Sequence, residues 1–431
     1  MLRLSSADSL PVVCPRCRAK HRVPLALEQV HFGGAVTVVD AHCPVCGTDF
    51  CQTLPNGQFN RFPVSISTDG QYVHVPERGN WLVELVRNGI AVGGGSYAIS
   101  RQRGLTAVPD GSPALLLLCL DPCYGHALMM LFNAQRHYEQ PRTHSDRPII
   151  AVVPRALAWL VPDYVAETWI VNAPLSALKG NLPDLDAFIK QQLSRFTDVF
   201  FSTARIHFDH RTTRFSDFTR TQKFDLNQFD QDPPRLTFVL REDRLWLRHG
   251  WERWLHKALA KLGLERRTRP LWARWQAVRY RNLAAVLHKK GVIVQITAVG
   301  ITGGGPFATD LGPAVHDDRQ PAPLSPQQER TWCEQYAKSH LVIGVHGSGL
   351  LLPTSLAAGF VCLLPPDKLA HYAEDVLMAH ENPIHQTLLG RFLPTAASPA
   401  QVADLIVNVL TEFPVWLAEE RERQATTGAI H

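Results

Sequence analysis

The chain has 431 residues, of which 45% are hydrophobic and 19% are charged, and its net charge is +5. These values describe a globular chain of two or three domains. No apolar run reaches the length that a bilayer-spanning helix needs, and the first residues lack the hydrophobic region of a secretion signal. The sequence therefore predicts a soluble, cytoplasmic protein without a membrane span.

Two CxxC pairs open the chain. Cys14 and Cys17 form the first, Cys43 and Cys46 the second, and 25 residues separate the pairs. Zinc takes four thiolates in a tetrahedron, and each pair supplies two of them. The alternative is two disulfides, which the missing secretion signal disfavours. Residues 1–60 are therefore predicted to form a ribbon with one structural Zn²⁺, whose closed coordination sphere leaves no position for catalysis.

Residues 61–110 combine short alternating strands with turns. Within them, Asn88-Gly89 is a typical hairpin turn. This segment is predicted to be a β-rich connector.

Residues 111–234 alternate apolar strands with helical segments, which predicts a parallel sheet covered by helices. The expected strands are Ala114–Leu120, Pro148–Val153, Thr168–Val171 and Asp198–Ser202. Asp121 and His126 follow the first strand, at the carboxyl edge where ligands of such sheets gather. A histidine near a helix start also serves as a capping or packing residue, so both interpretations stay open.

A second α/β domain is predicted over residues 235–431. Its first strand, Leu236–Leu240, delivers Arg241 and Arg244 at its end, where they either face phosphates or pair with neighbouring carboxylates. Six arginines crowd residues 266–281. They face phosphates or an acidic surface, or they form a solvated helix face.

The stretch from Ser325 to Leu364 has the clearest layout. A capped helix starts at Ser325, a fully apolar strand covers Leu341–Val345, and the turn His346-Gly347-Ser348-Gly349 leads into a helix expected to reach about Ala358. A second strand follows at Phe360–Leu364. The glycines are interpreted either as a phosphate-binding turn or as a tight strand-to-helix connection.

The segment LSPQQERTWCEQYAKSHLVIGVHGSGLLLPTSLAAG resembles the C-terminal signature of glycosyltransferase family 61, with Ser348 in place of the alanine of HGAGL. The resemblance implies two Rossmann-like domains of GT-B type, following the ribbon and the connector. It further implies an inverting, metal-independent sugar transfer to an acceptor hydroxyl, with a UDP-sugar as the default donor.

The resemblance also assigns residues. Arg241, Arg244 and His346 to Gly349 would hold the diphosphate, Gln328 or Glu329 would contact ribose or base, and His126 with Asp121 would supply the base. No catalytic metal and no nucleic-acid partner are expected, and the acceptor stays unspecified. Two alternatives remain: a nucleotide-sugar epimerase, and a non-catalytic protein whose ribbon contacts a partner or nucleic acid.

Overall fold

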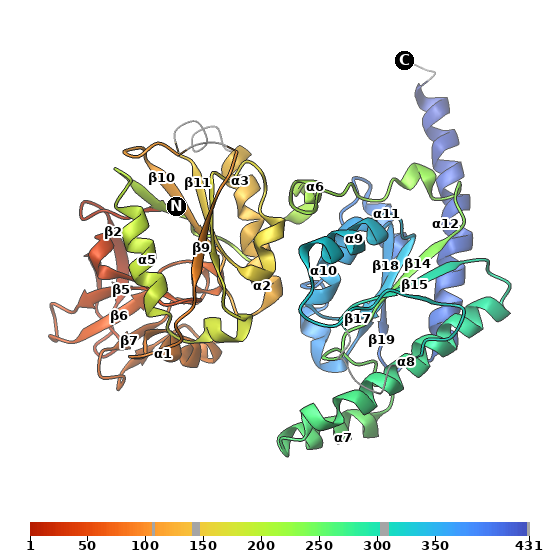
Figure 1. The fold of residues 1–431 in the computed structure, drawn as a ribbon, viewed down its shortest axis with the longest axis horizontal. Helices are drawn as coiled ribbons and strands as arrows, with labels where there is room; N and C mark the ends of the chain where they lie inside the picture. Colours follow the sequence, from red (N-terminus) through yellow and green to blue (C-terminus); the bar gives the residue numbers. More distant parts are fainter. Residues whose placement is uncertain (106–107, 140–146, 302–309, 429–431) are drawn as a thin grey trace. The chain divides into compact units, whose positions relative to one another are not determined.

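The computed structural model describes residues 1–105, 108–139, 147–301 and 310–428. The chain divides into two compact units, Met1–Asp209 and His210–His431 (Figure 1). Each unit contains a six-stranded β-sheet with helices packed around it, which confirms the predicted α/β class.

The boundary between the two units, at residues 209/210, falls earlier in the chain than the predicted boundary at residues 234/235. Residues 210–234 belong to the second unit because their backbone and aromatic side chains contact other residues of that unit. The Phe224 N–H donates to the Leu356 carbonyl, and Phe229 packs edge-on against His340 and Phe413. The irregular composition of the segment gave no sign of these contacts.

The central sheet of unit 1 has the strand order β1-β13-β10-β11-β12-β9. The four inner strands are mutually parallel, as predicted, and the two edge strands are antiparallel to them. Because β13 lies on one side of β10 and β11 on the other, the carboxyl ends of β10 and β13 form a topological switch point. The bounds are β1 Leu2–Arg3, β9 Ile99–Arg103, β10 Ala114–Leu118, β11 Ile149–Pro154, β12 Glu167–Val171 and β13 Val199–Phe201.

The predicted ribbon and connector are not separate bodies. The connector strands β7 and β8 extend a five-stranded antiparallel sheet, β4-β5-β6-β7-β8, that begins in the ribbon. Strands β1 and β9 from the same regions complete the central sheet. The antiparallel strands are β2 Ser9–Val13, β3 Lys20–Pro24, β4 Val30–Phe32, β5 Thr37–His42, β6 Asp49–Thr53, β7 Ser65–Ser67 and β8 Val73–His74.

The prediction of a hairpin turn at Asn88-Gly89 is wrong, because these residues lie in the last turn of helix α1, Val83–Ile90. Leu82, Val86 and Gly89 recur at helical spacing and are buried, so the 3.6-residue period outweighs the turn signal. A Cβ on Gly89 would lie 2.8 Å from the Cβ of Val36, so glycine here permits close packing. The other α-helices in the described residues of unit 1 are α2 Tyr124–Leu131, α3 Asn133–Glu139 and α5 Pro183–Leu193.

The sheet of unit 2 is parallel throughout and has the order β16-β15-β14-β17-β18-β19. Numbered along the chain, this is the order 3-2-1-4-5-6 of a doubly wound nucleotide-binding sheet. Its switch point lies between β14 and β17. The bounds are β14 Arg235–Val239, β15 Gln295–Val299, β16 His316–Asp317, β17 Leu341–Val345, β18 Gly359–Leu364 and β19 Gly390–Pro394.

The helices of unit 2 lie on both sides of this sheet (Figure 1). Their bounds are α6 Phe215–Thr219, α7 Gly250–Lys261, α8 Glu265–Lys289, α9 Pro326–Ala337, α10 Leu351–Leu356, α11 Pro383–Leu389 and α12 Pro399–Gly428. Within α12, Pro399–Arg423 has the length and composition of a membrane span, which differs from the prediction that no segment is long and apolar enough for one. It packs along α8 and α11 and buries a stripe that includes Val402, Ile406 and Phe413, while 39% of its most apolar 18-residue window is buried.

Candidate functional site

The four cysteines of the CxxC pairs come together in unit 1. Their sulfur atoms all lie within 4.8 Å of one another. The two knuckles have the same backbone form, since the N–H four residues after each first cysteine donates back to its carbonyl, from Arg18 to Cys14 and from Gly47 to Cys43. Arg18 and Gly47 both have positive φ, at 66° and 70°. The sequence repeat CPxC is therefore also a structural repeat.

The spacing of the sulfurs fits zinc. The Sγ atoms of Cys14 and Cys46 are 3.6 Å apart, as are those of Cys17 and Cys43. A disulfide requires about 2.05 Å, whereas a tetrahedron with Zn–S bonds of about 2.3 Å has edges of about 3.8 Å. These residues would hold one structural Zn²⁺ with no coordination position left for a substrate.

The switch point of unit 2 is formed by the loops that follow β14 and β17. The chain leaves β14 and turns back at Arg241 to Arg244, where the Arg244 N–H lies 3.4 Å from the Arg241 carbonyl. The same carbonyl is 3.5 Å from Nε2 of Gln276 on α8. The neighbouring strand β17 ends at Val345 and delivers His346 to Gly349 at the same edge of the sheet.

The two arginines lie against the two glycines. A Cβ on Gly347 would be 2.4 Å from Nε of Arg244, and one on Gly349 would be 2.6 Å from Cδ of Arg241. Gly347 also has a φ of 154°, which side-chain-bearing residues rarely adopt. Glycine at both positions therefore lets the guanidinium groups reach the carboxyl edge of the sheet.

The two guanidinium groups differ in their partners. Arg241 binds Asp243 through two contacts, Nε to Oδ1 at 2.8 Å and a terminal nitrogen to Oδ2 at 2.9 Å. Desolvation opposes ionisation of Asp243, but the hydrogen bonds from Arg241 and the charges of both arginines outweigh it and lower the pKa of the Asp243 carboxyl. Arg244 is exposed, and among the described residues no hydrogen bond or ion pair joins its guanidinium to a carboxylate, although its charge contributes to the lowered pKa of Asp243.

His346 is buried rather than presented to a ligand, with its side chain 1% exposed. Its Nε2 lies 3.1 Å and 3.2 Å from the carbonyls of His371 and Tyr372. Its Nδ1 lies 3.2 Å from a carboxylate oxygen of Asp375, without hydrogen-bond alignment. The side chain thus ties the loop after β17 to the segment after β18, and direct contact of this imidazole with a diphosphate does not fit its position.

The remaining residues predicted to bind the nucleotide-sugar lie at or near the carboxyl edge of the unit 2 sheet. Gln328, at the start of α9, donates to the Asp318 carboxylate at 3.2 Å, and Glu329 is half-buried one position later. Ser348 is half-buried on the loop. The helix expected from Gly349 to about Ala358 is shorter, with a 3₁₀ turn at Ser348–Leu350 before α10. Its dipole is correspondingly small, so the positive charge of this edge comes from the arginines.

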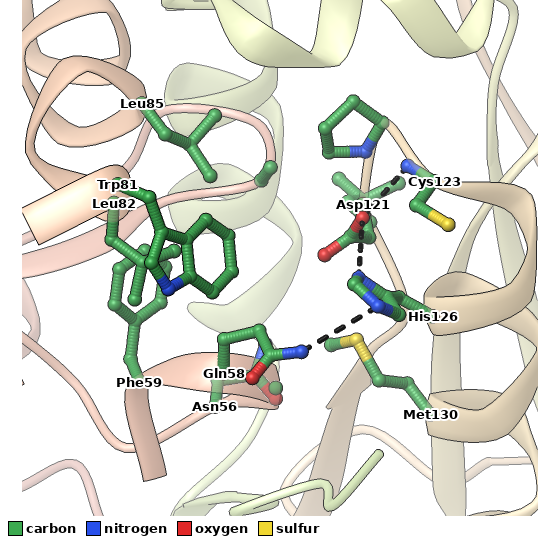
Figure 2. Close-up of a pocket in the computed structure, with 14 residues that line it drawn as sticks. Asn56, Gln58, Phe59, Trp81, Leu82, Leu85, Asp121, Cys123, His126 and Met130 are labelled. Carbon is green, nitrogen blue, oxygen red and sulfur yellow. Dashed lines mark hydrogen bonds and ion pairs between the residues drawn. The ribbon is translucent and has the colours of Figure 1, made fainter. Parts of the chain in front are cut away.

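Asp121 and His126 meet in a pocket of unit 1 (Figure 2). Nδ1 of His126 lies 3.3 Å from Oδ1 of Asp121, and the two side chains are 26% and 13% exposed. A carboxylate at Nδ1 favours the tautomer with its proton there and leaves Nε2 as the basic nitrogen. The cavity measures about 120 Å³, and its lining includes Leu120 to Cys123, which follow the carboxyl end of β10.

Sequence reasoning missed the residues that complete this pocket. Gln58 approaches Nε2 of His126 at 3.5 Å, and Trp81 lines the opposite wall (Figure 2). The loop that carries Gln58 is fixed to the sheet, since Asn56 donates to the Leu118 carbonyl and the Gly57 N–H to the Ala204 carbonyl. These residues come from the predicted ribbon and connector, and no motif connects them to Asp121.

Cys123 also belongs to this group, because its thiol lies with the Asp121 and His126 ligand atoms inside 4.8 Å. Such a trio has the ligand types of a transition-metal site. The group sits at the N-terminus of α2, however, where the helix dipole disfavours a cation. The Asp121 carboxylate already accepts the Cys123 N–H at 2.7 Å. The arrangement fits an oriented histidine better than a metal.

No protein-family model matches the chain, and no curated protein matches its sequence. Among solved structures, the chain is similar to the E. coli ADP-heptose LPS heptosyltransferase II, with 14% identity and a TM-score of 0.38 over 70% of this chain and 99% of that one. It is also similar to a trehalose-6-phosphate synthase, with 10% identity and a TM-score of 0.25 over 66% and 63% of the two chains. At these scores the likeness does not extend to the details of a site.

Proposed function

We propose that the protein is a glycosyltransferase of GT-B type that moves a sugar from a nucleotide-sugar, a UDP-sugar by default, to an acceptor hydroxyl. Configuration at the sugar would be inverted, without a catalytic metal. One observation carries the proposal: Arg241 and Arg244 lie against Gly347 and Gly349 at the switch point of a 3-2-1-4-5-6 sheet. Such switch points are where nucleotides bind in doubly wound sheets.

The arginines would act on the leaving group. As the bond between the sugar and the diphosphate breaks, the departing nucleoside diphosphate gains negative charge. Guanidinium groups stay protonated and bind phosphate oxygens in pairs, so they stabilise the transition state more than the bound substrate. Arg244 is the stronger candidate because no described carboxylate is hydrogen-bonded to it, while Arg241 is held by two hydrogen bonds to Asp243.

The Asp121–His126 pair would supply the base. Nε2 of His126 takes the proton of the acceptor hydroxyl, whose oxygen attacks the anomeric carbon while the bond to the diphosphate breaks. Asp121 orients the ring and stabilises the imidazolium that forms, as in a catalytic triad. His346, Gln328 and Glu329 would then hold the loops around the nucleotide, and the zinc group would stabilise unit 1.

The test is a binding panel followed by product analysis. UDP-, GDP- and CMP-sugars are added to the purified protein, and its melting temperature is recorded. We expect stabilisation by the UDP-sugars, with RT ln(1 + [L]/Kd) setting its size. If no sugar nucleotide stabilises the protein, the proposal fails.

Two other activities are distinguished by the products. An epimerase would convert the nucleotide-sugar without any acceptor, and a transferase would release free UDP that increases when the right acceptor is added. A non-catalytic protein would bind the nucleotide-sugar and leave it unchanged. Substituting Arg244 by glutamine should reduce stabilisation by the sugar nucleotide in each of these cases.

A further inference from the structure

Helices α7 and α8 form a hairpin with an unusual surface. The residues from Arg248 to Trp275, here called the Trp/Arg hairpin, begin directly after the β14 loop. Figure 1 shows α7 and the first part of α8 extending beyond the rest of unit 2. Neither the zinc group nor the proposed transferase site uses these side chains.

The hairpin exposes large apolar groups. Trp254 and Leu262 are each 71% exposed, Leu271 is 57% exposed and Trp251 is 51% exposed. At 3.6 residues per turn, Trp251 and Trp254 lie on the same side of α7 as Leu262, the residue that follows its last turn. Apolar side chains scattered singly need no explanation, but four large exposed ones on two packed helices favour a binding surface.

The apolar face is held in place across the hairpin. The rings of Trp251 on α7 and Trp275 on α8 meet edge-on at 5.6 Å, and Trp275 stacks on the buried Trp272 at 6.2 Å. The buried ion pair of Arg279 with Glu252 also joins the two helices. The exposed rings are therefore presented by a fixed support.

The hairpin also concentrates the positive charge of the chain. Between Arg248 and Arg274 the sequence has eight lysines and arginines against two glutamates, a formal charge of +6, whereas the whole chain has +5. In the part of the molecule that the structure describes, these basic side chains are exposed and have no carboxylate partner: Lys257, Lys261, Arg266, Arg267 and Arg274. The rest of the protein is close to neutral.

We propose that the Trp/Arg hairpin docks onto the surface of an anionic phospholipid bilayer. Tryptophan and leucine enter the boundary between headgroups and acyl chains, while arginine and lysine bind the phosphates. The aliphatic Leu262 and Leu271 favour a bilayer over nucleic acid, because they offer no ring on which a base stacks. The charge asymmetry favours it over an apolar protein partner. This proposal is independent of sugar transfer.

Vesicle co-sedimentation of the full chain tests the proposal. Phosphatidylcholine vesicles are compared with vesicles in which roughly a third of the lipid is phosphatidylglycerol. We expect binding to the anionic vesicles only, a blue shift of tryptophan emission, and release as salt rises from about 0.05 to about 0.5 M. Equal binding to both vesicle types, or to neither, would overturn the proposal.

Two pairs of variants locate the surface. Arg266→Gln with Arg267→Gln should weaken binding about 25-fold, at about fivefold per charge, whereas Lys289→Gln with Lys338→Gln, exposed elsewhere on unit 2, should leave it unchanged apart from a small general effect. Trp254→Ala with Leu262→Ala should weaken it at least about tenfold. Ile293→Ala with Val415→Ala, exposed outside the hairpin, is the matched apolar control.

The wild-type chain and the same variants also distinguish two other binding partners of the hairpin, nucleic acid and a second copy of this chain. If the wild-type chain shifts a labelled oligonucleotide and ignores vesicles, the hairpin is a nucleic-acid surface. If light scattering shows a dimer that Trp254→Ala with Leu262→Ala converts to a monomer, the hairpin joins two copies of this chain. Either result, without vesicle binding, replaces the bilayer proposal.

Discussion

Gly347 lies directly beneath the side chain of Arg244, so close that a Cβ at this position would stand 2.4 Å from the guanidinium Nε. The contact joins the loop after β17 to the loop after β14, the two strands that flank the switch point of unit 2. A methyl group at this position would displace Arg244 from the edge where a phosphate would bind.

Gly347→Ala should therefore weaken the affinity for a UDP-sugar about tenfold, because the charge-assisted contacts of Arg244 are misplaced. Isothermal titration calorimetry measures the change. Gly291→Ala is the matched control, since Gly291 also has positive φ, at 74°, but nothing would lie within 4 Å of its Cβ. The control should lose about 1 kcal/mol of stability and no affinity. Equal affinity in both variants would contradict the site.

Arg244→Gln should lower the affinity for the nucleotide by about ten- to a hundredfold, as expected for lost hydrogen bonds to a charged group. The affinity of Arg244→Lys should lie between those of the wild type and Arg244→Gln, because lysine keeps the positive charge but lacks the planar guanidinium group. Arg235→Gln, at the amino end of the same strand, is the control and should bind like the wild type. A similar loss of affinity in Arg235→Gln would mean that the loss comes from the change in overall charge and not from a contact of Arg244 with the nucleotide.

Asp121→Asn and His126→Asn should each lower kcat by about 10²- to 10⁴-fold, the range for a general base, with little change in nucleotide affinity. Steady-state kinetics with a saturating donor measures this. His31→Asn removes an exposed histidine paired with Asp40 at 2.7 Å in the same unit, and should leave kcat unchanged. Full activity in the His126 variant would remove this residue from the mechanism.

Metal analysis should find one zinc per chain. Cys17→Ser should lose it and lower the melting temperature by about 10 °C, because metal binding contributes to folding. Cys51→Ala, which removes a buried thiol outside the group of four, should keep the metal. A second equivalent that disappears in His126→Asn would show that Asp121, Cys123 and His126 bind a metal, against the expectation here.

Glu167 should make unit 1 sensitive to acid. It is 2% exposed and accepts from Arg101 at 2.5 Å and from Arg195 at 2.9 Å. Desolvation opposes ionisation, but the hydrogen bonds from Arg195 and Arg101 outweigh it, so the pKa of the Glu167 carboxyl is lowered. A lowered pKa in the folded state gives stability that is present above the ordinary glutamate pKa and lost as the pH falls through the folded value.

Denaturant titrations at several pH values check this prediction. Glu167→Gln should cost about 3 kcal/mol at neutral pH, because two arginines lose their charged partner, and its stability should vary less with pH below about 4.5. Glu84→Gln, from an exposed pair with Arg87, should cost less than about 1 kcal/mol. Identical pH profiles for the wild type and Glu167→Gln would contradict the assignment.

The sequence by itself determined the elements whose signals are local. The apolar runs of β10, β11, β14, β17 and β18 predicted buried parallel strands, because strands covered on both faces have no polar alternation. The start of α9 and the two CxxC pairs were equally predictable from local sequence. In the helix cap, and within each CxxC pair, the residues involved are only three positions apart. These patterns specified the α/β class and the cysteine group.

Tertiary structure alone decided which side chains face the candidate sites. His346 has the sequence position of a ligand-binding residue, but the carbonyls of His371 and Tyr372 draw its ring into the interior. Gln58 reaches His126 because the neighbouring Asn56 and Gly57 are hydrogen-bonded to carbonyls of segments distant in the chain. Helix α1 includes Asn88-Gly89, and its residue Val86 lies in one buried cluster with Val36. Local patterns encode period and burial, whereas the partners of a side chain depend on how distant strands are ordered in a sheet.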